Sequence, residues 1–200
     1  MHPDLKLLSQ TDIYLIDQYF KGRLNPEMKV LDAGAGNGRN LSYFLKEGYD
    51  VTAIDQNFYS VDQIKQIYEY FKISNIDDKV FCLDLKHLDY DATFDFIICN
   101  AVLHFVETEI DFHLIIDKLW KALKPGGTLF IRLSTQISVE NVIKPIGGNR
   151  FQLPSGTTWY LPDLNQLLEK TEQLGATLVD PIKTTNVQNM RSMTTWVLSK

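Results

Sequence analysis

A glycine-rich turn between two apolar segments constrains the fold of this chain more than any other feature. Val30 and Leu31 close a short apolar run, glycines follow at positions 34, 36 and 38, and residues 39–48 carry apolar side chains at helical spacing. This order predicts a strand, a tight turn and a helix. Glycine suits such a turn because its backbone bends sharply and lets a ligand approach with no Cβ in the way, at the positive end of the helix.

The next apolar run ends in an acid. Residues 51–55 predict a second strand, and Asp55 stands at its carboxyl end. A carboxylate in that position can accept hydrogen bonds from both hydroxyls of a ribose. The glycine turn and Asp55 together therefore predict a ligand that contains adenosine.

The glycine spacing narrows the choice of ligand further. A dinucleotide site has the pattern G-x-G-x-x-G, whose backbone amides cradle a pyrophosphate, whereas this chain has G-x-G-x-G preceded by Asp32. An acid there disfavours a pyrophosphate and favours an ammonium group. S-adenosylmethionine joins adenosine to an amino acid and a sulfonium, so it fits both observations. For the glycines alone, a turn without any cofactor is the alternative.

Residues 30–40, together with Asp55, are similar to the cofactor motif of class I S-adenosylmethionine-dependent methyltransferases. Within that class, Gly-Asn-Gly-Arg-Asn at 36–40, followed by Gly-Tyr-Asp-Val at 48–51, resembles the small methyltransferases of the tellurite-resistance type. The Lys-Pro-Gly-Gly turn at 124–127 is also typical of the class. The resemblance covers residues 30–133 by motifs and residues 165–200 by pattern.

The remaining chain alternates between strand and helix patterns, and one α/β sheet is the simplest outcome. Thr11 is the expected N-cap of the first helix. The resemblance implies a doubly wound, Rossmann-like sheet of seven mostly parallel strands, with an antiparallel last strand between the fifth and sixth and helices on both faces. Apolar spacing predicts helices over 12–24, 60–71, 112–123 and 164–174, and strands over 80–85, 94–102, 128–133, 176–180 and 193–199.

The composition predicts one globular domain. A chain of 200 residues buries roughly 70% of its unfolded surface, so no disulfide or metal is needed, and Cys82 and Cys99 are expected to pack as small apolar residues inside strands. We expect a single methyltransferase domain over 1–200, in which residues 1–25 form a helical cover and residues 134–162 a substrate loop or lid.

Charge and hydropathy exclude several partners. The net charge of -5 argues against a nucleic-acid partner, which normally leaves a basic footprint. The sequence shows neither a signal peptide nor a stretch long enough to span a membrane, so we expect a cytoplasmic protein, a monomer or homodimer, with no membrane partner. His2, His87 and His113 fall in different elements, and no metal site is predicted.

Open α/β sheets bind ligands outside the carboxyl ends of their strands, and the resemblance implies cofactor contacts at those ends. It places an acid near the adenine amino group, here Asp84, and an apolar residue against the ring. Capping of the following turn is the alternative for Asp84, and satisfying local backbone groups is the alternative for Asn100. The predicted cofactor-binding residues are Asp32, Ala33, Gly34, Gly36, Asn40, Asp55, Gln56, Asp84, Leu85, Asn100 and Ala101.

Two residues are candidates for the reaction itself. His104 follows the fourth predicted strand, where a neutral imidazole could accept a proton or orient an acceptor. Arg191 matches an arginine that lies near the acceptor site in the tellurite-resistance subgroup, and it could bind an oxyanion. This chain has Met190 where the subgroup has a histidine, a departure that bears on the subgroup's metalloid chemistry. A packed histidine and a solvated hairpin arginine are the alternatives.

Aromatic side chains are the candidates for the substrate pocket, with ordinary core packing as the alternative for each: Tyr14, Tyr19, Phe105, Trp159 and Tyr160. The predicted function is in-line methyl transfer from S-adenosylmethionine to a small-molecule acceptor. Alignment of the reacting groups can remove on the order of 7–11 kcal/mol of the barrier, so such a site often has no obligatory nucleophile or base of its own, and a base matters only if the acceptor arrives protonated. The competing hypotheses are a non-catalytic cofactor-binding module and a nicotinamide-dependent oxidoreductase.

Overall fold

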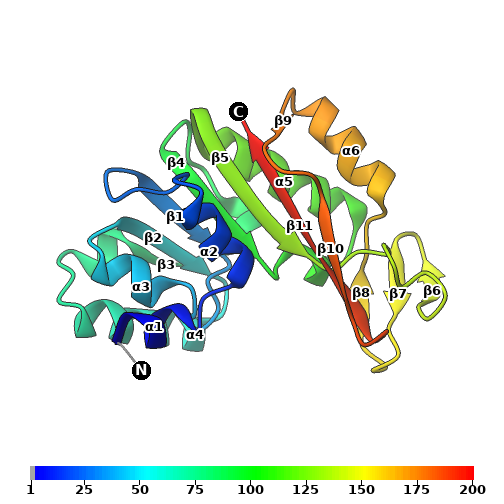
Figure 1. Ribbon diagram of the computed structural model, residues 1–200, viewed down its shortest axis with the longest axis horizontal. Helices are drawn as coiled ribbons and strands as arrows, with labels where there is room; N and C mark the ends of the chain where they lie inside the picture. Colours follow the sequence, from blue (N-terminus) through cyan, green and yellow to red (C-terminus); the bar gives the residue numbers. More distant parts are fainter. Residues whose placement is uncertain (1–2) are drawn as a thin grey trace.

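The computed structural model describes residues 3–200, so Met1 and His2 lie outside the described residues. One large sheet has the order β10-β11-β5-β4-β1-β2-β3 (Figure 1). The pairs among β1 to β5 are parallel, and β11 is antiparallel to both β5 and β10. The strands are β1 (Lys29–Ala33), β2 (Asp50–Asp55), β3 (Val80–Cys82), β4 (Phe94–Asn100), β5 (Leu123–Leu133), β10 (Lys183–Val187) and β11 (Arg191–Ser199).

The predicted Rossmann-like sheet, mostly parallel with an antiparallel last strand, is confirmed. Seven strands form the continuous path, and the two-residue β9 (Thr177–Leu178) pairs with β11 as an eighth. The strand expected over 176–180 is present only as the short β9, whereas the longer neighbour of the last strand is β10, which was not predicted. The sequence Lys-Thr-Thr-Asn-Val of β10 is too polar to show the apolar alternation on which the prediction relied.

Helices cover both faces of the sheet (Figure 1). One core cluster contains apolar side chains of α5 and α6, and the other contains those of α2, α3 and α4. The strands alternate between these cores, since Leu31 faces the first and Val30 the second. The helices are α1 (Pro3–Leu8), α2 (Ile13–Phe20), α3 (Leu41–Lys46), α4 (Phe58–Tyr70), α5 (Glu109–Ala122) and α6 (Leu164–Gln173), with short 3-10 turns η1 (Ile76–Asp78), η2 (Leu85–His87) and η3 (Leu103–Phe105).

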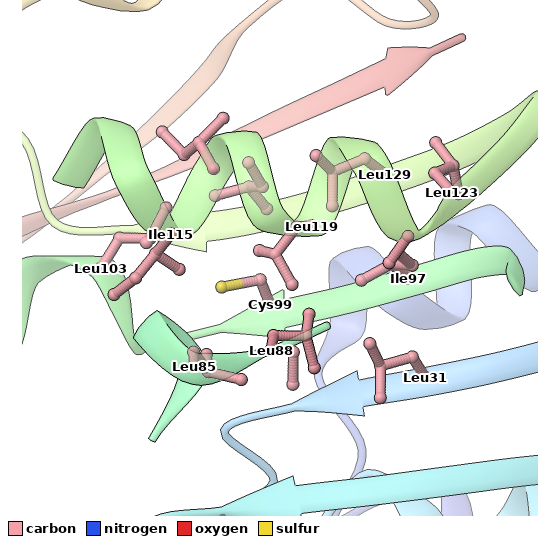
Figure 2. Packing of buried hydrophobic residues seen from close by; sticks show 14 of the residues in the cluster. Leu31, Leu85, Leu88, Ile97, Cys99, Leu103, Ile115, Leu119, Leu123 and Leu129 are labelled. Carbon is pink, nitrogen blue, oxygen red and sulfur yellow. The ribbon is translucent and has the colours of Figure 1, made fainter. Parts of the chain in front are cut away.

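The two cysteines have different environments. Cys99 is fully buried in β4 among leucines and isoleucines of α5 and the strands (Figure 2), and burial raises the pKa of its thiol. Cys82 ends β3 and is exposed, with Sγ 3.6 Å from the carbonyl of Gln56. The expectation of a packed residue is thus confirmed for Cys99 and wrong for Cys82, because β3 ends three residues earlier than predicted.

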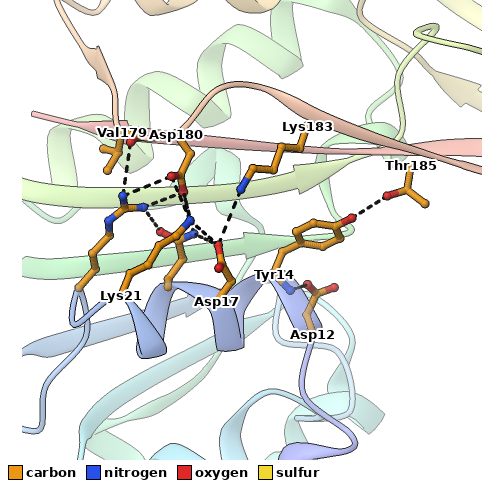
Figure 3. Close-up of polar contacts among 10 residues, drawn as sticks. Asp12, Tyr14, Asp17, Lys21, Val179, Asp180, Lys183 and Thr185 are labelled. Atoms are coloured by element: carbon orange, nitrogen blue, oxygen red, sulfur yellow. Dashed lines mark hydrogen bonds and ion pairs between the residues drawn. The ribbon is translucent and has the colours of Figure 1, made fainter.

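The N-terminal helical cover is attached to the C-terminal strands. Asp12, rather than the predicted Thr11, caps α2 by accepting the Tyr14 N–H at 2.9 Å. The Tyr14 hydroxyl lies 2.7 Å from Thr185 Oγ1 in β10, and Asp180 accepts hydrogen bonds from Gln18, Lys21 and Arg23 (Figure 3). These contacts fix α2 across the edge of the sheet.

Residues 134–162 are more regular than predicted. Instead of an irregular loop they contain a three-stranded antiparallel sheet, β6 (Lys144–Gly147), β7 (Arg150–Gln152) and β8 (Thr158–Tyr160), at one end of the molecule (Figure 1). Val139, Ile143 and Leu161 form a small core of their own beneath it. Within residues 3–200, no helix has the length and apolar character needed to cross a bilayer.

Candidate functional site

Two adjoining cavities open at the carboxyl ends of the parallel strands. The first has a volume of about 530 Å³ and the second about 430 Å³. Both are lined by Gly34, Gly36, Ala101 and Phe105, which therefore mark their junction. Volumes of this size are typical of small-molecule sites.

The glycine loop forms the floor of both cavities. The N–H groups of Gly34 and Ala35 both donate to the Ile54 carbonyl, at 2.8 and 2.9 Å, which fastens the loop to the end of β2. Gly34 has φ +78°, and a Cβ there would lie 2.4 Å from a methyl group of Val102. Gly36 has φ +57°, and a Cβ there would meet no atom within 4 Å. Gly34 is thus required by the packing, whereas Gly36 leaves free space in the cavities.

Asp55 lies in the first cavity with its carboxylate held against the loop. Its Oδ2 accepts the Gly36 N–H and its Oδ1 accepts the Asn57 N–H, both at 2.8 Å. Each carboxylate oxygen can accept more than one hydrogen bond. The residue therefore keeps acceptor capacity for a ligand, and Gln56 lines the same cavity beside it.

Asp84 caps the turn that follows it and also lines the first cavity. Its Oδ1 accepts the Lys86 N–H at 2.9 Å and caps η2, as the capping alternative predicts. The residue also lines the first cavity together with Leu85. The Lys86 Nζ lies 3.7 Å from the other oxygen, Oδ2, so the acid has a cation beside it at the cavity wall.

Asn100 ends β4 at the second cavity and is only 6% exposed. Within residues 3–200, neither its Oδ1 nor its Nδ2 has a hydrogen-bond partner. A buried polar group without a partner costs about 1–3 kcal/mol, so a ligand in the second cavity that bonded to this amide would recover that cost. The alternative, that it satisfies nearby backbone groups, is not what the geometry shows.

Asp32 and Ala33 lie beneath the loop and line neither cavity. Asp32 is 1% exposed, its Oδ2 has no partner within residues 3–200, and burial raises its pKa to about 7. Ala33 is fully buried in the core. Asn40 lines the second cavity, where its Oδ1 accepts the Asp12 N–H at 3.0 Å.

His104 lies in η3 at the wall of the second cavity and is 2% exposed. Its Nδ1 accepts the Ser134 N–H at 3.2 Å. The ring centroid lies 4.3 Å from that of Phe105 and 4.5 Å from that of Trp159. Burial, and secondly the charge of Arg191, lower the pKa of the imidazole to about 4. Arg191 begins β11 and lines the same cavity, so the structure brings the two candidates together.

The structure places the aromatic candidates in different environments. Phe105 and Trp159 line the second cavity. Tyr14 lies behind its wall, with its ring 4.8 Å from the Arg132 guanidinium. Tyr19 packs edge-on against Tyr43, and Tyr160 is buried against Phe112. Tyr19 and Tyr160 line neither cavity, so their contacts are those of core packing.

Sequence reasoning missed Arg132 and its partner Asp12 at the second cavity. Arg132 lines it and pairs with Asp12, which also lies 3.8 Å from Arg39, another lining residue. Arg132 stands in the apolar strand Thr-Leu-Phe-Ile-Arg-Leu. An arginine inside a buried strand requires an acidic partner, and that rule could have pointed to the site.

Comparison with known proteins agrees with this geometry. A family model described as tellurite resistance protein TehB matches residues 22–177. The tRNA 5-carboxymethoxyuridine methyltransferase of Escherichia coli (strain K12) is 30% identical over 106 residues, which are 52% of this chain and 39% of that protein. The probable S-adenosyl-L-methionine-dependent methyltransferase TehB of Haemophilus influenzae (strain 10810) is 33% identical over 81 residues, 40% of this chain and 27% of that protein. The chain spans less than half of the length of these relatives.

Solved structures share the fold. The 1,6-didemethyltoxoflavin-N1-methyltransferase of Burkholderia thailandensis, solved with 1,6-didemethyltoxoflavin and S-adenosylhomocysteine, superposes with a TM-score of 0.68 and 21% identity, over 93% of this chain and 75% of that one. The likeness concerns the fold alone. The family match over residues 22–177 covers more than half of the chain and shows that it belongs to the tellurite resistance protein TehB family, among the class I S-adenosylmethionine-dependent methyltransferases.

Proposed function

We propose that this protein transfers the methyl group of S-adenosylmethionine to a small-molecule acceptor. The observation that carries the proposal is the pair of adjoining cavities, one walled by Asp55 and Asp84 and the other by His104 and Arg191. A cofactor in the first would present its reactive end at the junction with the second. Bound S-adenosylmethionine supplies a methyl group on a sulfonium, which a nucleophile can displace in line.

The residues present fit this cofactor. Asp55 keeps acceptor capacity for ribose hydroxyls, and the free space above Gly36 leaves room for a ligand against the loop. The unpartnered amide of Asn100 lines the second cavity and would bind the amino-acid part of such a ligand, and the buried carboxyl of Asp32 beneath the loop would add negative charge for its ammonium group. Asp84 and Leu85 would contact the adenine.

The second cavity favours a small acceptor with an anionic group. Arg39, Arg132 and Arg191 line it, and Asp12 pairs with the first two. Within residues 3–200, Arg191 has no ion-pair partner, so it adds positive charge toward the acceptor. Phe105 and Trp159 offer apolar surface beside it. The E. coli relative is named for a substrate with a carboxymethoxy group, which agrees with an anionic acceptor.

Two alternatives predict different outcomes. A non-catalytic binding module would bind the cofactor without turnover. A tRNA acceptor, suggested by the name of the E. coli relative, is disfavoured by the net charge of -5, because nucleic-acid binding sites are normally basic.

The test is a turnover assay that measures S-adenosylhomocysteine released from S-adenosylmethionine. Small carboxylates, phenols and amines form one arm, and bulk tRNA forms another. Release with a small acid supports the proposal. Cofactor binding by calorimetry with no release in any arm would favour the binding module, and release with tRNA alone would overturn the small-molecule acceptor.

A further inference from the structure

A group of buried hydroxyls lies where β5 separates from β11. Backbone pairing between these strands runs from Thr128 opposite Ser199 to Leu133 opposite Thr194. Beyond it, the Ser192 hydroxyl accepts the Thr135 N–H at 3.2 Å and donates to the Thr135 carbonyl at 2.6 Å. We call the four fully buried residues of this group the hydroxyl seam: Ser134, Thr135, Ser192 and Thr194.

Further contacts close the seam. Ser134 Oγ donates to the Ser192 carbonyl at 2.7 Å, and Thr135 Oγ1 lies 2.7 Å from Thr194 Oγ1. Side chains thus replace the backbone ladder at the register position that would pair Thr135 with Ser192. The ends of both strands remain joined without the next pair of backbone hydrogen bonds.

The other side of β5 faces the chain leaving β4. There the Ala101 N–H donates to the Arg132 carbonyl at 2.7 Å. Two residues further along the chain, just beyond the end of β5, the Ser134 N–H donates to Nδ1 of His104 at 3.2 Å. At this position the imidazole Nδ1 therefore accepts a hydrogen bond that a backbone carbonyl would accept in a continued strand pairing.

This bond decides the tautomer of His104. A backbone N–H can only donate, so Nδ1 must be unprotonated and the neutral ring carries its proton on Nε2. His104 lines the second cavity, and Nε2 is the ring nitrogen left for it. Phe105 and Trp159 both pack against the ring, and they contact each other edge-on.

We propose that the hydroxyl seam is the positioning device of the acceptor site: it holds the Ser134 N–H on Nδ1, so that His104 presents Nε2–H as a hydrogen-bond donor. His104 then orients a lone-pair-bearing atom of the acceptor and does not remove its proton. Ser192 also follows Arg191 directly, so the same residue fixes the start of β11 on the opposite side of the cavity. The inference rests on the proposed function in placing the acceptor in this cavity.

The test uses nitrogen-15 NMR of the full chain at neutral pH. We expect the His104 ring to show the Nε2–H pattern and the Ser134 amide proton to be protected from exchange. In Ser192→Ala the Ser134 amide proton should exchange about ten-fold faster or more, since the end of its strand is no longer held. The His104 ring should also lose its single tautomer pattern. Thr184→Ala is the matched control, because its hydroxyl contacts only Thr194 within residues 3–200 and its removal leaves Ser192 and Thr135 bonded.

Two results would overturn the proposal: a Nδ1–H or cationic His104 in the wild-type protein at neutral pH, or a Ser192→Ala variant whose Ser134 amide and His104 pattern do not change. The wild-type spectrum decides the tautomer even if Ser192→Ala fails to fold, and Ser192→Cys then serves as the milder variant. Wild-type protein that binds no S-adenosylhomocysteine would contradict the proposed function alone, since the tautomer is read without ligand.

Discussion

The N–H of Gly36 donates to Oδ2 of Asp55 across 2.8 Å, so the turn after β1 and the acid at the end of β2 form one hydrogen-bonded unit. Because Gly36 also adjoins both cavities, a change at Asp55 alters two things at once. It removes an acceptor for the ligand and it releases the loop that lies beneath the ligand.

Asp55→Ala should therefore weaken S-adenosylhomocysteine binding strongly. Loss of a charge-assisted hydrogen bond costs roughly 1.5–3 kcal/mol, an effect of about ten-fold or more in Kd. Isothermal titration calorimetry checks the value. Asp62→Ala, at an exposed position of α4, is the control and should bind like the wild type. Equal affinity in the Asp55 variant would remove the ribose assignment.

Asp32→Asn should stabilise the protein and weaken cofactor binding. Burial raises the folded pKa of Asp32 from 3.8 to about 7, so wild-type stability falls as the pH rises from about 4 to about 7, where the buried carboxyl must ionise. The asparagine variant does not lose stability in this way. Its free energy of unfolding should equal that of the wild type near pH 4 and exceed it by up to about 4 kcal/mol above pH 7. Urea unfolding at pH 4 and pH 8 measures it.

The same variant removes a negative charge that favours the ammonium group of the cofactor. Its affinity for S-adenosylhomocysteine should fall at pH 8, and calorimetry gives the change. A variant that is less stable than the wild type at pH 8, or that binds equally well, would contradict the role given to Asp32.

Two glycines of the loop should respond differently to alanine. Gly34→Ala places a Cβ 2.4 Å from Val102 at φ +78° and should destabilise the fold by roughly 2–3 kcal/mol. Gly36→Ala meets no protein atom, so it should cost only about 1–2 kcal/mol of stability while reducing cofactor affinity. Gly175→Ala has a similar φ of +63° and free space, and it should cost the same stability without affecting binding. Thermal unfolding and calorimetry on the three variants separate these effects.

Asp180→Asn should loosen α2 from the C-terminal strands. Asp180 accepts hydrogen bonds from Arg23 at 2.7 Å, Gln18 at 3.0 Å and Lys21 at 3.1 Å, and these partners, Arg23 first, hold its pKa well below the usual range. Its contribution is present above about pH 4 and is lost as the pH falls further. We expect a loss of about 2 kcal/mol at pH 7, measured by urea unfolding.

The control for this prediction is Asp89→Asn. Asp89 pairs with Lys121 at 3.0 Å, but its side chain is 78% exposed, and surface pairs contribute little. Equal stability of the two variants at pH 7 would show that the Asp180 contacts do not hold α2 in place.

Local sequence signals predicted the cofactor side of the site. The glycines, Asp55 and Asp84 each stand at the end of a strand that its own apolar residues reveal, and parallel strands bring such ends together. Arg132 and Asp12 are 120 positions apart, and Thr135 and Ser192 are 57 apart. No spacing along the chain shows such contacts, so of the residues that line the second cavity on the proposed acceptor side, only His104, Arg191, Phe105 and Trp159 were predicted.

Polar strands were the other feature that the sequence did not predict. β10 and the strands β6 to β8 lie at edges or on the surface, where one side contacts water and apolar alternation is weak. The prediction of a loop over 134–162 followed from its glycines and prolines, which the structure places in the turns and ends of a small sheet. Tyr19 and Tyr160 illustrate the opposite error, because an aromatic residue of the core looks like one of a pocket until its neighbours are known.

The small sheet touches the rest of the site at few points: Arg150 pairs with Glu107 at the first cavity, and Trp159 packs on His104 at the second. The residues proposed to contact the cofactor, Asp55, Asp84 and Asn100, all belong to the large sheet and its following turns. Residues 144–160 can therefore vary without disturbing those contacts. For protein engineering, the proposed function thus predicts that grafts of this segment from relatives should change the acceptor and keep the methyl donor.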